Sequence, residues 1–130
     1  MAARGRPPLP QHARFAVIPR GFDGCVYAAE LGNGLVKVGF SANPRTRMTS
    51  LSKYARRVFG VSLQRFHVGA NLPKRVAARA ETNTLRRLNR SATPLAGTKE
   101  YFAGLRFGDA VNLVNQMTRA ATPTPAEQGA

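Results

Sequence analysis

Residues 24–41 read Gly24-Cys-Val-Tyr-Ala-Ala-Glu-Leu-Gly-Asn-Gly-Leu-Val-Lys-Val-Gly-Phe-Ser41, and this stretch decides the fold. Two runs rich in β-forming residues flank a Gly32-Asn33-Gly34 turn, and turns of this composition favour a tight β-hairpin. We therefore predict a hairpin of two antiparallel strands, near residues 25–31 and 35–41.

A loop made of the three turn residues fixes which side chains meet across the hairpin. It pairs Ala29 with Lys37 and Tyr27 with Gly39. The odd-numbered positions then share one face, where a phenol and an ammonium lie beside a residue without a side chain. Such a face could admit a phosphate, while the even-numbered valines pack on the opposite face.

The rest of the chain predicts helices around this hairpin. A helix capped by Asn43 is expected to begin at Pro44 and run to about Ala55, and a strand is expected over residues 61–70. A second helix, capped by Asn71, should run through Leu88. A short extended Glu100-Tyr101-Phe102 segment and a helix over residues 109–121 follow. We expect an α/β (α+β) domain with a small three-stranded antiparallel sheet flanked by helices.

The 130 residues suffice for one domain with a modest core. Residues 1–20 combine prolines with arginines and are predicted to be a flexible basic arm, because they cannot bury enough surface to offset the ordering entropy. The domain then covers residues 21–121. Residues 122–130 have the composition of a disordered tail.

Charge points to the class of partner. The chain has 20 Lys and Arg residues, six acidic residues and a formal charge of +14, which favours a polyanion. Nucleic acid, most simply DNA, is the leading candidate, and an anionic membrane surface is the alternative. No run approaches the roughly 20 apolar residues of a spanning helix. With the single Cys25 and no signal-peptide pattern, we expect a cytoplasmic protein.

Four side chains could together hydrolyse a phosphodiester: Tyr27, Lys37, Arg47 and Glu81. Arg47 suits bidentate phosphate binding, and Glu81 offers hard oxygen ligands to Mg²⁺ or Mn²⁺. Tyr27 or Lys37 could move a proton if its pKa is lowered. Glu81 is the most telling residue, because helical spacing places it with Ala77, Leu85 and Leu88 on a core-facing stripe.

Three of these residues, Tyr27, Lys37 and Glu81, also have an ordinary structural interpretation. Tyr27 could be an aromatic at the edge of the core, and Lys37 a solvated strand lysine. Glu81 could form a structural salt bridge with Arg79, Arg86 or Arg47.

The order of the motifs resembles the GIY-YIG nuclease superfamily, and most of all its phage and bacterial branch whose second motif reads Lys-Ile-Gly. The matching residues are Cys25-Val26-Tyr27, Lys37-Val38-Gly39, Arg47, Glu81 and the closing Glu100-Tyr101-Phe102. The resemblance implies that Tyr27 and Lys37 line the active site, that Arg47 binds the scissile phosphate, and that Glu81 coordinates one divalent cation. Cys25 departs from the Gly of the first motif, and Lys37 replaces the Tyr of the better-known second motif.

The leading hypothesis is a metal-dependent endonuclease that hydrolyses phosphodiester bonds in DNA with one Mg²⁺ or Mn²⁺. The alternative is a non-catalytic nucleic-acid-binding module with the same fold, and a third possibility is an interaction protein. A homodimer or a protein partner could supply specificity to so small a domain. The predicted DNA contacts are Arg45, Arg47, Lys53, Arg75 and Arg79.

Overall fold

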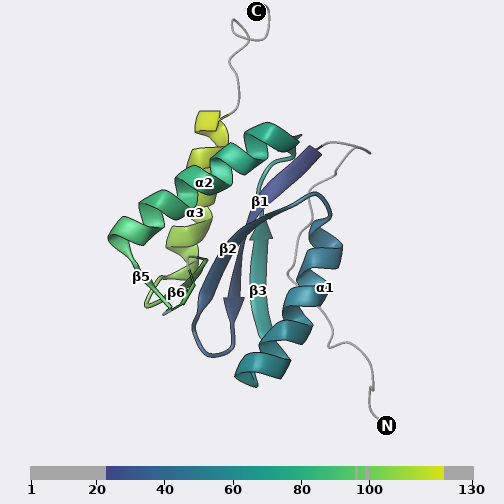
Figure 1. Ribbon diagram of the computed structural model, residues 1–130, viewed down its shortest axis with the longest axis vertical. Coiled ribbons are helices and arrows are strands. Elements are labelled where there is room, and N and C mark those ends of the chain that lie inside the picture. The colour runs from purple at the N-terminus through teal and green to yellow at the C-terminus, as the bar shows by residue number, and fades with distance from the viewer. Residues whose placement is uncertain (1–22, 96, 99, 122–130) are drawn as a thin grey trace, which may run out of the picture.

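Figure 1 shows the protein as a computed structural model, which describes residues 23–95, 97, 98 and 100–121. These residues form an α+β fold with an antiparallel sheet and three α-helices. The long strands are β1 (Asp23–Leu31), β2 (Val36–Ser41) and β3 (Leu63–Val68), and the short ones are β4 (Leu72–Pro73), β5 (Thr93–Pro94) and β6 (Tyr101–Ala103). The helices are α1 (Pro44–Tyr54), α2 (Lys74–Ser91) and α3 (Phe107–Ala121). The predicted arm 1–20 and tail 122–130 lie outside the described residues.

The predicted hairpin and its register are confirmed. Tyr27 pairs with Gly39 and Ala29 with Lys37 across β1 and β2. The backbone N–H of Leu31 donates to the carbonyl of Leu35 at 2.8 Å, which closes the turn. The alternation of side chains along the pair therefore follows the prediction.

The prediction of a three-stranded sheet is wrong in the number of strands. The strands lie in the order β3-β1-β2-β6-β5, and β4 pairs with the start of β1. The extra strands have only two or three residues each, too few to show the alternation that marks a strand in a sequence. The pairing of β6 with β2, through Tyr101 opposite Lys37, has a functional consequence because it brings residue 100 to the site.

The predicted capping of α2 by Asn71 is also wrong. The helix begins at Lys74, and Pro73 occupies the capping position without a side-chain hydrogen bond. Leu72 and Pro73 instead pair with Gly24 and Asp23 of β1. Sheet pairing therefore holds in an extended conformation the residues that the sequence assigned to the first helical turn. The helix itself ends at Ser91, close to the predicted end.

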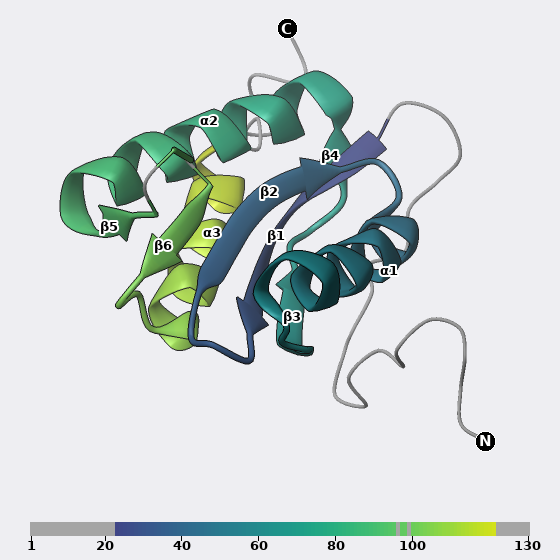
Figure 2. The same ribbon diagram turned by 60° about the horizontal axis from the view of Figure 1, so that its bottom comes forward.

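Helices cover both faces of the sheet. Figure 2 shows α1 on one face and α2 with α3 on the other. The odd-numbered hairpin residues, Tyr27 among them, pack under α1 against Met48 and Leu51. The even-numbered valines pack against α2 and α3 through residues such as Ala80 and Val114. The odd-numbered face is thus buried for most of its length, and an open site is confined to its edge.

Helix α1 sets the position of the side chains beside that edge. Its N-terminus is capped as predicted, because the Asn43 side-chain oxygen accepts a hydrogen bond from the backbone N–H of Thr46 at 3.2 Å. At its other end it continues into the π-helix η1 (Ala55–Phe59), which Gly60 ends with a φ of 70°. None of the helices in the described part is long and apolar enough to cross a membrane.

Candidate active site

Tyr27 of β1 lies directly over Gly39 of β2. The tyrosine is only 1% exposed. A Cβ atom added to Gly39 would lie 2.5 Å from the Tyr27 hydroxyl oxygen and 2.7 Å from its Cζ. Only glycine at this position leaves room for the ring, so the Val-Gly part of the second motif positions the tyrosine of the first.

Lys37 is neighboured by a carboxylate and two aromatic rings. Its Nζ donates to Oε1 of Glu100 at 2.6 Å, and it lies 5.8 Å from the ring centroid of Tyr27 and 5.1 Å from that of Tyr101. The lysine is 8% exposed, so it is not a solvated strand lysine. Glu100 was not among the predicted site residues, although the Glu-Tyr-Phe element that contains it was the signal that could have identified it.

Arg47 and Glu81 reach the site from different helices. Arg47 is exposed on α1, one turn before Leu51, and lines the pocket beside Lys37. Glu81 is half-buried on α2. Neither residue takes part in the two ion pairs found among the described residues, which are Lys37–Glu100 and Arg65–Glu30. The structural salt bridge considered for Glu81 is therefore not seen among the residues that the structure describes.

The predicted core stripe of α2 needs a correction. Its buried residues are Ala77, Ala80, Thr84 and Leu88, whereas Glu81 lies at the half-buried margin of that face. The predicted stripe starts with two successive steps of four, from Ala77 to Glu81 and on to Leu85, and each such step overshoots a full turn by about 40° in a helix of 3.6 residues per turn. Glu81 consequently has the partial solvent access that a ligand-binding carboxylate needs.

Electrostatic coupling places these side chains in one cluster. Burial raises the pKa of Glu81, the nearby charge of Glu100 raises it further, and Lys37 and Arg47 oppose the rise. The pKa of Tyr27 is likewise raised by burial, against the lowering effect of Arg47. The four residues predicted from sequence, which come from four separate elements, thus lie close enough to act on one another together with Glu100.

The protonation of Tyr27 restricts its chemistry. Its raised pKa, caused chiefly by burial, keeps the phenol neutral at physiological pH. A neutral phenol donates or accepts a hydrogen bond but does not serve as a strong base. Tyr27 in this environment is suited to orienting a water molecule or a phosphate oxygen.

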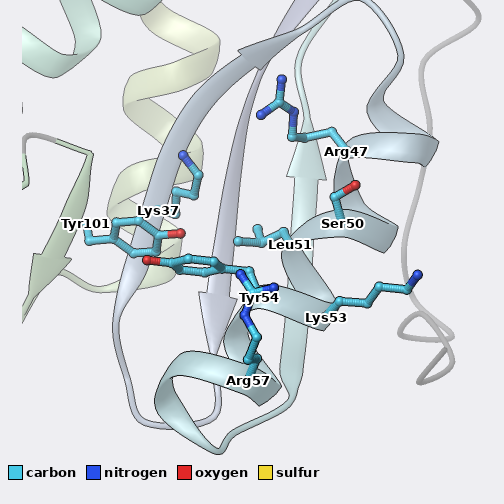
Figure 3. A pocket seen from close by; sticks show the side chains of 8 residues that line it. All are labelled: Lys37, Arg47, Ser50, Leu51, Lys53, Tyr54, Arg57 and Tyr101. Atoms are coloured by element: carbon cyan, nitrogen blue, oxygen red, sulfur yellow. The ribbon is translucent and has the colours of Figure 1, made fainter. Parts of the chain in front are cut away.

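A cationic pocket of about 450 Å³ adjoins the cluster (Figure 3). It is lined by Lys37, Arg47, Ser50, Leu51, Lys53, Tyr54, Arg57 and Tyr101. Of the predicted DNA contacts, Arg47 and Lys53 line this pocket. The other three, Arg45, Arg75 and Arg79, are exposed on α1 and α2 outside it.

The donor set suits a weakly held divalent cation. No group of three or more His, Cys, Asp or Glu side chains that could hold a metal occurs in the described ranges. Mg²⁺, however, commonly binds through one or two carboxylates together with water and substrate phosphates. Glu81 supplies hard oxygen atoms, and the repulsion from Glu100 that raises its pKa is of the kind that a bound cation relieves.

Comparison of the whole chain with protein-family models, with curated proteins and with solved structures gives no match. Function is therefore inferred from the chemistry of the site.

Proposed function

We propose that this protein is a metal-dependent endonuclease of the GIY-YIG type, which hydrolyses phosphodiester bonds in DNA. The observation that carries the proposal is the clustering of Tyr27, Lys37, Arg47 and Glu81. These residues are far apart in the sequence and come from two strands and two helices, yet they influence one another electrostatically. Hydrolysis of a phosphodiester is helped by cations that stabilise the developing phosphoryl charge, by a carboxylate that can hold a divalent metal and by a group that positions the water, and these four side chains can supply all three.

Each group has a role that follows from its surroundings. Arg47 lines an open pocket and binds the scissile phosphate, where its guanidinium stabilises the charge that develops in the transition state. Lys37 adds a second positive charge held in place by Glu100. Glu81 would hold the divalent cation, whose chemistry there would be to polarise the phosphate and to lower the pKa of water.

Tyr27 orients the attacking water. Water adds to phosphorus, the bond from phosphorus to one sugar oxygen breaks, and that oxygen leaves as an alcohol after it takes up a proton. The water loses one proton to solvent, so the reaction consumes one water molecule for each bond cut. Because the Tyr27 phenol stays neutral, its hydroxyl oxygen accepts a hydrogen bond from the water without taking its proton.

The flanking DNA backbone is held by exposed cations on two helices. Arg45 and Lys53 lie on α1, and Arg75 and Arg79 lie on α2. Contacts of this kind carry affinity without sequence information. They leave the choice of cutting site to other features of the protein and its DNA.

A non-catalytic module is the second candidate, and one specific observation favours it. Lys37 is paired with Glu100 at 2.6 Å, so part of the positive charge in the site is already compensated. A DNA-binding protein with the same fold would keep its exposed arginines and have no use for the Glu81 carboxylate.

Cleavage of plasmid DNA separates the two candidates. The expected result is nicking or cutting in Mg²⁺ or Mn²⁺, none in chelator, and a loss of at least about 100-fold in Glu81→Ala, the size of loss typical of an electrostatic catalytic group. Asp109→Asn is the matched control, because Asp109 is an exposed carboxylate on α3 outside the cluster. Binding without metal-dependent cutting on linear, supercoiled and branched DNA would refute the nuclease and favour the module.

A further inference from the structure

The pocket beside the candidate active site is lined by Tyr54, whose ring packs against two other aromatic rings. Tyr54, at the end of α1, lies 6.1 Å from Tyr101 with ring planes 29° apart, a stacked arrangement. The ring centroid of Phe59, in the π-helix, lies 6.0 Å from that of Tyr54, in an edge-on arrangement, and 6.0 Å from that of Tyr101. Tyr101 is 9% exposed, whereas Tyr54 is 36% exposed. Two neighbouring rings therefore hold Tyr54 in place while part of its surface stays open.

Cations lie beside the two tyrosine rings, and none of the described residues that line the pocket carries a carboxylate. The guanidinium of Arg57 lies 5.8 Å from the ring centroid of Tyr54, and Lys37 lies 5.1 Å from that of Tyr101. Figure 3 shows Tyr54 and Tyr101 side by side between these two cations, with Arg47 farther along α1. With Lys53, the lining that the structure describes has four positively charged residues and no acidic one.

Such a pocket fits one chemical class of ligand. Nucleobases that have left a helical stack bind to aromatic rings and to arginine guanidinium planes, and their phosphates bind cations. A volume of about 450 Å³ lies within the range of small-ligand sites. Bases inside a duplex are paired and stacked, so they cannot reach the face of Tyr54.

We propose that this pocket binds a single unpaired nucleotide of DNA next to the phosphate that is cut. The base stacks on Tyr54 beside Arg57, and Arg47, which belongs to both the pocket and the catalytic cluster, contacts the adjoining phosphate. The preferred substrate is then DNA with an unpaired nucleotide, such as a bulge or a junction. This inference rests on the proposed function for the identity of its ligand.

The test compares the affinity of the full-length protein for two synthetic DNA hairpins that differ by one bulged adenine. Binding is measured in chelator, so that no cutting occurs. The wild-type protein is expected to favour the bulged hairpin by about 5- to 150-fold, the range that stacking of one base on an aromatic ring supplies. Tyr54→Leu, which keeps an apolar side chain but removes the ring, should abolish the preference.

Arginine variants provide the matched control. Arg57→Ala should reduce the preference, whereas Arg56→Ala should leave it unchanged, because Arg56 is equally exposed on η1 but does not line the pocket. Equal affinity of the wild-type protein for both hairpins would overturn the proposal, as would a full preference in a folded Tyr54→Leu variant. A wild-type protein that cuts DNA with metal but does not favour the bulged hairpin would refute this inference alone. A preserved preference without cutting would refute only the nuclease activity.

Discussion

Substitution of Gly39 by alanine is expected to weaken the proposed nuclease activity strongly while the protein still folds. The new Cβ atom would lie 2.5 Å from the Tyr27 hydroxyl oxygen and 2.7 Å from its Cζ, whereas ordinary contact begins at 3.4 Å. The phenol must therefore move by roughly 1 Å. Tyr27 is 1% exposed and packs in the core under α1, so this movement displaces a ring that its neighbours hold in place.

The displacement has a cost in catalysis and a cost in stability. A misplacement of about 1 Å in an active site reduces a rate by about 100-fold. Overpacking of a buried site typically costs about 1–3 kcal/mol in the free energy of unfolding. We therefore expect Gly39→Ala to cut plasmid DNA about 100-fold more slowly than the wild type, with a lower Tm but a cooperative unfolding transition.

Gly24→Ala is the matched control for this variant. Its Cβ would lie 2.5 Å from Cε2 of Phe40, an equally close approach to an aromatic ring on the same hairpin. Phe40 follows Gly39 in β2 and so points to the opposite face of the sheet from Tyr27. Activity of Gly39→Ala close to that of the wild type, or an equal loss in both variants, would refute the assignment of a catalytic role to the position of Tyr27.

Three further predictions concern charge. Because the pKa of Glu81 is raised in the folded protein, ionisation of this group opposes folding as pH rises through that pKa. Glu81→Gln should therefore raise the Tm at pH 7 while removing cleavage, and the gain should vanish below about pH 4, where the carboxyl is protonated in both states. An unchanged or lower Tm at pH 7 would contradict this. Glu100→Gln should lower the pKa of Glu81, because it removes a neighbouring negative charge. Carboxyl NMR of the metal-free protein measures that pKa, and an unchanged pKa would show that the two groups are not coupled. Arg75→Ala and Arg79→Ala should each weaken DNA binding at all sequences and reduce the slope of log affinity against log salt by about 1, and an unchanged slope would place these arginines away from DNA.

The central hairpin could be predicted from the sequence because its determinants are local. A Gly32-Asn33-Gly34 turn fixes the loop, and a fixed loop fixes the register that sets Tyr27 against Gly39. The helix start at Asn43-Pro44 and the strand near residues 63–68 are local in the same sense. Each of these features depends on residues only a few positions apart, so chain-order reasoning reaches it.

The site needed contacts between distant segments, which chain order does not contain. The pairing of β6 with β2 brings Glu100 to Lys37 across 63 positions of sequence, and a strand of three residues carries no pattern that announces this. The margin position of Glu81 depends on how α2 packs on the sheet. Local sequence patterns therefore specified the hairpin and the residue types of the candidate site. Three features came from the packed fold: the ion pair of Glu100 with Lys37, the burial that keeps Tyr27 neutral, and the place of Tyr54 beside the site. Burial and charge coupling arise only once the helices cover the sheet.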